Sequence, residues 1–168
     1  MVDQNLDIQY MKAAISMARR GLGFCSENPS VGCVIVSKAG HVVGRGFTQK
    51  GGRPHAETVA LAQAGSAASG ATLYVTLEPC THHGKTPPCA EAIIAAGIAR
   101  VVIGALDVDP RVAGKSQTIL EESGIEVIAG ICAKECASLL SGFASRMVKG
   151  RPFITLKAGM TLDGKMPQ

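Results

Sequence analysis

The sequence predicts an α/β protein built as a three-layer α/β/α sandwich, with helices on both faces of a mixed central sheet. Two features of the 168-residue chain support this fold class. Hydrophobic residues make up 46% of the chain and aromatic residues only 4%, a composition that suits buried, mostly parallel strands. After one helix and one hairpin, helical and strand-like patterns alternate. A chain of this length can bury the core of one such domain.

Apolar spacing and glycines mark the first helix and the hairpin that follows it. The spacing predicts a helix from about Asp7, its N-cap, to Arg20, and Gly21 ends it. The apolar run at 31–36 predicts a strand, and residues 41–47 predict the strand that pairs with it.

The remaining elements alternate between helix and strand. A Gly-rich polar stretch, 48–54, delivers His55 to the start of a helix that ends near Gly65. Further strands are predicted at 71–77, 100–105 and 125–129, and further helices at 88–97, 114–123 and 134–149. Side chains at the carboxyl ends of strands and the amino ends of helices converge on the crevice where α/β folds bind ligands.

Three residues in short motifs are of the types that zinc prefers. His55 supplies an imidazole, and the Pro-Cys pairs at Cys80 and Cys89 supply two thiolates. One His and two Cys leave the fourth position of zinc to water, which is typical of catalytic sites. Taken singly, each would more often be a buried structural residue. Together they predict one zinc ion per chain bound by His55, Cys80 and Cys89.

Glu57 is the predicted general acid and base. A His-x-Glu sequence followed by Pro-Cys and a second Cys is the signature of zinc nucleobase deaminases, in which the Glu is not a ligand. The alternative role of Glu57, in the first turn of a helix, is to stabilise the helix dipole, and both roles can hold at once. Backbone amides near Ala56 and Cys80 are candidates for holding the substrate.

The segment between the two Cys is longer than the usual Cys-x-x-Cys spacing of such enzymes. It contains two imidazoles, a cation and a hydroxyl beside the predicted metal. Lys85 and Thr86 suit phosphate or other polar groups of a substrate. His82 and His83 are candidates for substrate contact, although a solvated loop tip fits His83 equally well.

Charge and composition argue against nucleic acid or a membrane as the partner. The net charge of +4 is mild, no run of Lys or Arg appears, and the chain has no Trp. The first ten residues lack an apolar signal segment, and no stretch approaches the length of a membrane span. Six Cys fit metal ligands and buried thiols better than a disulfide framework. We therefore expect a soluble cytoplasmic protein that acts on a small molecule.

Several motifs together resemble a known family. They are Asn28-Pro-Ser-Val-Gly-Cys, His55-Ala-Glu, the segment 76–89, Asp107-Val-Asp-Pro and Val112-Ala-Gly-Lys. Over nearly its whole length the chain resembles the deaminase domain of the RibD family of bifunctional riboflavin biosynthesis proteins, in the cytidine deaminase-like superfamily. The resemblance implies zinc-dependent hydrolytic deamination of diaminohydroxyphosphoribosylaminopyrimidine to the aminouracil product and ammonia.

The same resemblance implies roles for individual residues, with some departures. It implies that Asn28 contacts the pyrimidine, and that Lys85, with His82 and Thr86, helps to hold the substrate. Thr48, expected to face the substrate, stands where the family usually has His. Asp109 stands where the family has Asn, and it would bring a carboxylate near a phosphorylated ligand if it points inward. These differences bear on substrate affinity and choice, not on the zinc chemistry.

Residues 1–150 are thus expected to form a zinc-dependent deaminase domain. Residues 151–168 resemble the opening strand of the family's reductase domain. The sequence stops within that domain, so no reduction is expected of this chain. Without their sheet partners, these last residues should be extended or domain-swapped.

Two other hypotheses stay open. One is a cytidine or deoxycytidylate-type deaminase, which the long Cys-to-Cys loop disfavours. The other is an inactive, zinc-stabilised binding module. Related folds often form homo-oligomers, and the sequence leaves the number of subunits undecided.

Overall fold

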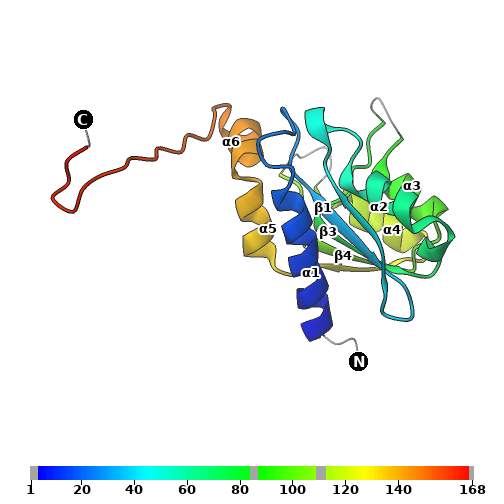
Figure 1. The fold of residues 1–168 in the computed structure, drawn as a ribbon. Coiled ribbons are helices and arrows are strands. Elements are labelled where there is room, and N and C mark those ends of the chain that lie inside the picture. Colours follow the sequence, from blue (N-terminus) through cyan, green and yellow to red (C-terminus); the bar gives the residue numbers. More distant parts are fainter. Residues whose placement is uncertain (1–3, 84–86, 109–112, 167–168) are drawn as a thin grey trace.

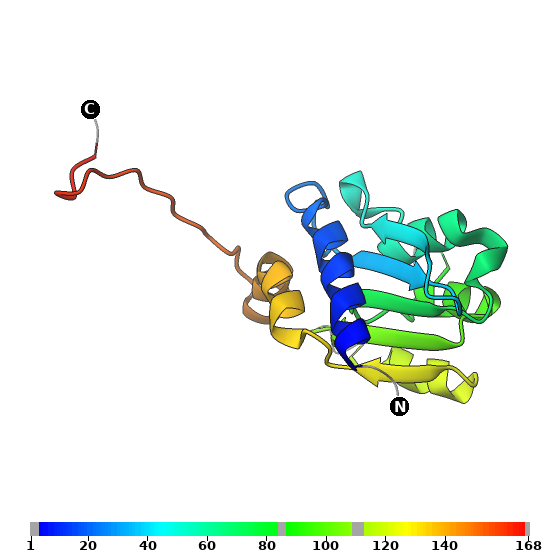
Figure 2. The same ribbon diagram turned by 60° about the horizontal axis from the view of Figure 1, so that its bottom comes forward.

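In the part of the chain that the structure describes, five strands form one mixed sheet in the order β2-β1-β3-β4-β5 (Figures 1 and 2). The computed structural model describes residues 4–83, 87–108 and 113–166. The strands are β1 (Gly32–Val36), β2 (Val42–Phe47), β3 (Thr72–Leu77), β4 (Arg100–Ala105) and β5 (Glu126–Ala129). β1 pairs antiparallel with β2 and with β3, whereas β3, β4 and β5 run parallel. The hairpin produces the first antiparallel pair, and helical crossovers produce the parallel ones.

Helices cover both faces of this sheet (Figure 2). On one face lie α1 (Gln4–Arg19) and α5 (Ala133–Leu139). On the other lie α2 (Ala56–Ala64), α3 (Cys89–Ala95) and α4 (Lys115–Glu122). Short 3-10 turns at Lys50–Gly52 and Gly65–Ala68 flank α2. Each face has its own cluster of buried apolar side chains. The predicted three-layer α/β/α sandwich is confirmed.

Two glycines of β2 let α2 lie directly on the sheet. A side chain at Gly46 would collide with the carbonyl oxygen of Ala56, and one at Gly44 would collide with that of Ala60. The absence of a Cβ at these positions permits the close approach of helix and strand backbones. The contact fixes the amino end of α2, where His55 and Glu57 lie.

The first helix begins earlier than predicted, and Asp7 is not its N-cap. α1 starts at Gln4, so Asp7 lies inside the helix, where its side chain is buried. Its carboxylate accepts hydrogen bonds from Nη1 and Nη2 of Arg100, at 2.9 and 2.7 Å, and from the Tyr74 hydroxyl at 2.9 Å. The capping signal misled because an Asp near a helix start fits a cap and a buried ion pair equally well.

Acidification is expected to destabilise the protein through Asp7. Hydrogen bonds from Arg100, and then from Tyr74, hold the pKa of Asp7 below its ordinary value of 3.8, against the opposing effect of burial. The unfolded chain therefore binds this proton more tightly. The stabilisation is complete above the unfolded pKa and is lost as the pH falls through the folded pKa beneath it. Urea unfolding between about pH 2 and 6 should show a smaller loss of stability for Asp7→Asn than for the wild type. Equal pH dependence in both proteins would contradict this role.

The single long helix predicted at 134–149 is wrong. The chain forms α5 and a separate α6 (Ser141–Lys149), with a break at Leu140, whose φ of −97° and ψ of 5° lie outside the helical range. Leu140 is buried in the core, whereas α6 has no buried residue. The Ser138 and Ser141 hydroxyls donate to backbone carbonyls, which competes with continuous helix geometry.

The last described residues extend away from the sandwich (Figures 1 and 2). Residues 151–166 are exposed and contain no helix or strand. The segment is thus extended, one of the two arrangements expected for it, and its assignment to a second domain stays a prediction. Among the described residues, no helix has the length and apolar character needed to cross a bilayer.

Candidate active site

The three predicted metal ligands come from three separate elements on one side of the sandwich. His55 is the residue before α2, Cys80 follows β3, and Cys89 is the first residue of α3. The backbone amide of Cys89 donates to Sγ of Cys80 at 3.3 Å, and the amide of Ala90 donates to the Cys80 carbonyl oxygen at 3.2 Å. These bonds fix the segment after β3 against the start of α3.

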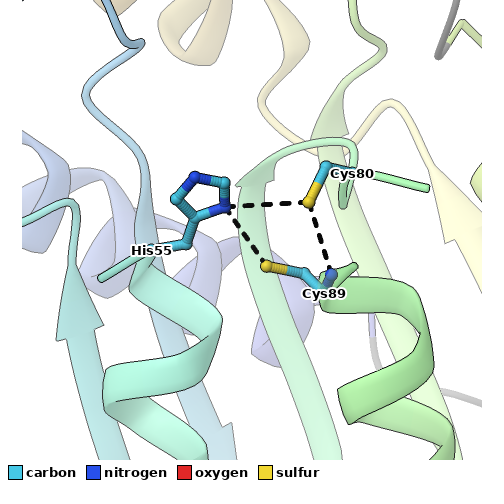
Figure 3. Close-up of side chains that lie close together, drawn as sticks. All are labelled: His55, Cys80 and Cys89. Atoms are coloured by element: carbon cyan, nitrogen blue, oxygen red, sulfur yellow. Dashed lines mark hydrogen bonds between the residues drawn. The ribbon is translucent and has the colours of Figure 1, made fainter. Parts of the chain in front are cut away.

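The ligand atoms lie close enough to share one ion (Figure 3). Nδ1 of His55 is 3.3 Å from Sγ of Cys89 and 3.7 Å from Sγ of Cys80, and all three atoms lie within 4.8 Å of one another. Tetrahedral zinc with its usual bond lengths would separate a nitrogen and a sulfur ligand by about 3.6 Å. The donor set and its spacing therefore fit zinc.

The electrostatics of the site favour a thiolate at Cys80. The hydrogen bond between the two thiol groups lowers the pKa of Cys80, and the bonds from His55 and from the Cys89 amide lower it further. The same thiol–thiol hydrogen bond, together with burial, raises the pKa of Cys89. Bonding to Cys80 also raises the pKa of His55. Thiolate is the form of cysteine that binds a metal.

Glu57 lies beside the ligands without joining them. It is in the first turn of α2 and only 4% exposed, and it lines the same pocket as His55 and Cys80. Burial raises the pKa of its carboxyl group, because the charged form loses its contact with water. A buried carboxyl group of this kind is suited to holding and passing on a proton.

The pocket has a volume of about 240 Å³ and contains some of the predicted substrate residues. Asn28, Thr48 and His82 line it. Oγ1 of Thr48 already accepts a hydrogen bond from the Val31 amide at 2.9 Å, so its hydroxyl supports the backbone as well as facing the pocket. Ala56 is fully buried at the start of α2.

The remaining predicted substrate residues are not found in the pocket lining of the described residues. Lys85, Thr86 and Asp109 lie outside the described residues. His83 is exposed, and its Nε2 lies 3.6 Å from Oε2 of Glu91 on the surface of α3.

Several residues that line the pocket were missed by the sequence reasoning. They are Arg53, Glu78, Phe143, Arg146 and Met147. The position of Glu78 directly before Pro79-Cys80 was an available signal. The last three lie on α6, far along the chain from every motif, and nothing local marks them.

Glu78 is a buried carboxylate that holds the neighbouring loop in place. It is 3% exposed and accepts hydrogen bonds from the amides of Asp107, Gly114 and Ser116, at 3.2, 3.0 and 3.1 Å. The Ser116 hydroxyl adds a fourth bond at 3.0 Å. Because Cys80 is only two residues away, this network joins the metal-binding segment to the start of α4.

Glu78→Gln is expected to lower the free energy of unfolding by about 1–3 kcal/mol, because the amide nitrogen would face backbone donors that it cannot accept from. Chemical denaturation measures this loss. Glu122→Gln, an exposed change at the end of α4, is the matched control and should change stability by less than about 0.5 kcal/mol. Equal effects of the two substitutions would contradict the buried network.

Comparison with known proteins agrees with the geometry. Residues 4–105 match the family described as the cytidine and deoxycytidylate deaminase zinc-binding region. Riboflavin biosynthesis protein RibD of Aquifex aeolicus is 51% identical over 163 residues, which are 97% of this chain and 46% of that protein. The Escherichia coli RibD is 52% identical over 159 residues, 95% of this chain and 43% of that protein. The chain therefore spans less than half the length of these relatives.

Solved structures give the same result. The RibD structure from Acinetobacter baumannii has a TM-score of 0.87 at 50% identity, covering 95% of this chain and 45% of that one. A Thermotoga maritima protein described as a diaminohydroxyphosphoribosylaminopyrimidine deaminase and 5-amino-6-(5-phosphoribosylamino)uracil reductase has a TM-score of 0.90 at 44% identity, covering 96% and 47%. A guanine deaminase from Nitrosomonas europaea, at 20% identity and a TM-score of 0.61 over 80% of this chain and 82% of its own, shares the fold.

Proposed function

The chain belongs to the cytidine and deoxycytidylate deaminase zinc-binding family, and from this membership we propose that it hydrolytically deaminates diaminohydroxyphosphoribosylaminopyrimidine in riboflavin biosynthesis. The products would be the aminouracil and ammonia. The observation that carries the proposal is the convergence of His55, Cys80 and Cys89 beside Glu57 in one pocket. Identity of about 50% with RibD proteins over nearly the whole chain supports this substrate over other pyrimidines.

In this proposal, His55, Cys80 and Cys89 hold one zinc ion per chain. The family and the His/Cys cluster both suggest zinc. The chemistry that zinc supplies in such a site is the activation of water for nucleophilic attack at neutral pH. Three protein ligands leave room for that water, and two cysteines offset the charge of the ion.

Glu57 is proposed to move the protons of the reaction. Its carboxylate takes a proton from the attacking water and gives it to a ring nitrogen of the pyrimidine. It then takes the second proton from the hydroxyl group now on that carbon and gives it to the departing amine, so that water and the C–NH₂ group become C=O and ammonia. Its buried position beside the ligands keeps bulk water away from these transfers.

The substrate contacts are proposals of the same kind. Asn28 and His82 line the pocket and would bind the pyrimidine and its polar substituents, with Thr48 beside them. The backbone at Ala56 offers an amide at the start of α2. Lys85 and Thr86 are proposed to help hold the phosphate or other polar groups of the substrate. Asp109 stands where the family has Asn and would bring a carboxylate near the phosphorylated ligand if it points inward.

The domain organisation also follows the resemblance. Residues 1–150 are proposed to be the deaminase domain, and residues 151–168 to be the start of a reductase domain. The exposed apolar side chains of residues 153–166 support this, because a strand of a second domain would bury them.

The test is an ammonia-release assay on protein whose metal content has been measured. We expect about one zinc per chain and turnover of the phosphoribosylated diaminopyrimidinone, with cytidine and deoxycytidylate as control substrates. Turnover of the cytosine compounds alone would replace the proposal with a general cytidine deaminase. Zinc without turnover of any of them would favour the inactive binding module.

A further inference from the structure

Helix α6 forms one wall of the active-site pocket, although it lies far along the chain from the metal ligands. Phe143, Arg146 and Met147 line the pocket together with His55 and Glu57. The family match ends at residue 105, well before this helix. Any ligand that fills the pocket therefore contacts a surface supplied by α6.

The helix is weakly packed against the rest of the domain. None of its residues is buried, and Gly142 faces open space. A second hollow, of about 380 Å³, lies between α6 and the loop after α1. Arg146 and Phe143 line both hollows, so this part of α6 is a partition with open volume on each side. Apolar packing therefore contributes little to holding α6 in one position.

Two polar contacts of Arg146 connect α6 to the opposite wall of the pocket. Nη1 of Arg146 lies 2.9 Å from Oε2 of Glu27, and Nη2 donates to the Glu27 carbonyl oxygen at 2.7 Å. Asn28, the next residue, lines the pocket and is a proposed pyrimidine contact. The Arg146 guanidinium thus contacts both the side chain and the backbone of Glu27, the residue directly before Asn28. Figure 1 shows α6 beside this loop.

We propose that Arg146 is a positioning residue for substrate affinity, acting through its contact with Glu27 to hold α6 and Asn28 on opposite walls of the pocket. The inference rests on the proposed deaminase function, because it concerns the same pocket. It predicts an effect on substrate binding and none on zinc or on proton transfer, since Arg146 belongs to neither group. It also predicts that Arg146 matters more than Glu27, because the carbonyl contact survives loss of the Glu27 side chain.

The experiment compares Arg146→Ala, Glu27→Ala and the double variant in the ammonia-release assay. Arg146→Ala should raise KM about tenfold, and Glu27→Ala only about threefold, because a charged hydrogen bond to a carbonyl outweighs an exposed ion pair. Both should leave kcat and zinc content unchanged. The double variant should match Arg146→Ala alone, because both contacts with Glu27 are made by the Arg146 guanidinium. Arg146→Lys should be intermediate, since an ammonium cannot make both contacts at once.

Lys149→Ala is the matched control, because it removes a positive charge from the same helix at a residue that lines neither hollow among those described. It should leave KM unchanged. Hydrogen exchange of the α6 amides provides a readout that needs no activity, and Arg146→Ala should accelerate it while Lys149→Ala should not.

Unchanged KM in Arg146→Ala, with an active wild type, would overturn this inference alone. A fall in kcat accompanied by loss of zinc would also overturn it. So would hydrogen exchange of the α6 amides that is as slow in Arg146→Ala as in the wild type. An inactive wild type would instead overturn the proposed function and this inference with it.

Discussion

Glu57→Gln is expected to lower kcat by about two to four orders of magnitude, the range for loss of a general acid and base. Glutamine keeps nearly the same shape at the start of α2 but cannot take up or release a proton at neutral pH. Because Glu57 is not among the proposed ligands, zinc content should stay at the wild-type value. Ammonia release and metal analysis on the same preparations test both statements.

The control for Glu57 is Glu91→Gln. Glu91 is also in the first turn of a helix near the site, but it is exposed on α3. It therefore reproduces the loss of a helix-dipole interaction without the loss of a proton carrier. Activity retained in Glu57→Gln, or an equal fall in both variants, would show that Glu57 has only a structural role.

Arg100→Met is expected to lower the free energy of unfolding by about 3–5 kcal/mol, the cost of leaving one partner of a buried ion pair uncompensated. The Arg100 side chain is 11% exposed and that of Asp7 is 4% exposed. Without the guanidinium, the Asp7 carboxylate would keep the hydrogen bond from the Tyr74 hydroxyl but would lose the positive charge that offsets its own. Urea denaturation at pH 7 measures the change.

Glu126→Gln separates this buried pair from an exposed one that uses the same arginine. Oε1 of Glu126 lies 3.2 Å from Nε of Arg100, but its side chain is 54% exposed. Its replacement should cost at most about 1 kcal/mol. Tyr74→Phe, which removes one hydrogen bond to Asp7, should cost about 1–2 kcal/mol and keeps the test open if Arg100→Met does not fold. Similar losses for Glu126→Gln and Arg100→Met would contradict the buried pair.

Several elements of this fold are determined by local signals in the sequence. The strand at Thr72–Leu77 and the helices after His55 and before Gly97 were predicted within one or two residues. Apolar runs bounded by glycine and proline determine these elements, because the period of the pattern and the chain breakers act over a few neighbours. The single helix predicted at 134–149 was wrong because Leu140 is drawn into the core, an effect that no local pattern contains.

The metal-binding motifs were also local enough to find. His55, Cys80 and Cys89 were predicted to share an ion from their residue types and flanking prolines, and the fold brings their ligand atoms together. Their coordination of zinc stays a prediction. Glu57 was predicted from its spacing from His55 together with the two Pro-Cys pairs, and its role as general acid and base also stays a prediction.

The sequence by itself determined the α/β class, the group of residues suited to zinc and the order of the main helices and strands as far as β5. Only the tertiary structure decided that Asp7 pairs with Arg100, 93 positions away, and that Arg146 reaches Glu27 across 119. The tertiary structure also decided that the Glu78 carboxylate accepts hydrogen bonds from the amides of Asp107 and Gly114, in a loop distant in sequence. The physical reason is that residue type and spacing act between neighbours, whereas contacts between residues far apart in the sequence depend on how the layers pack.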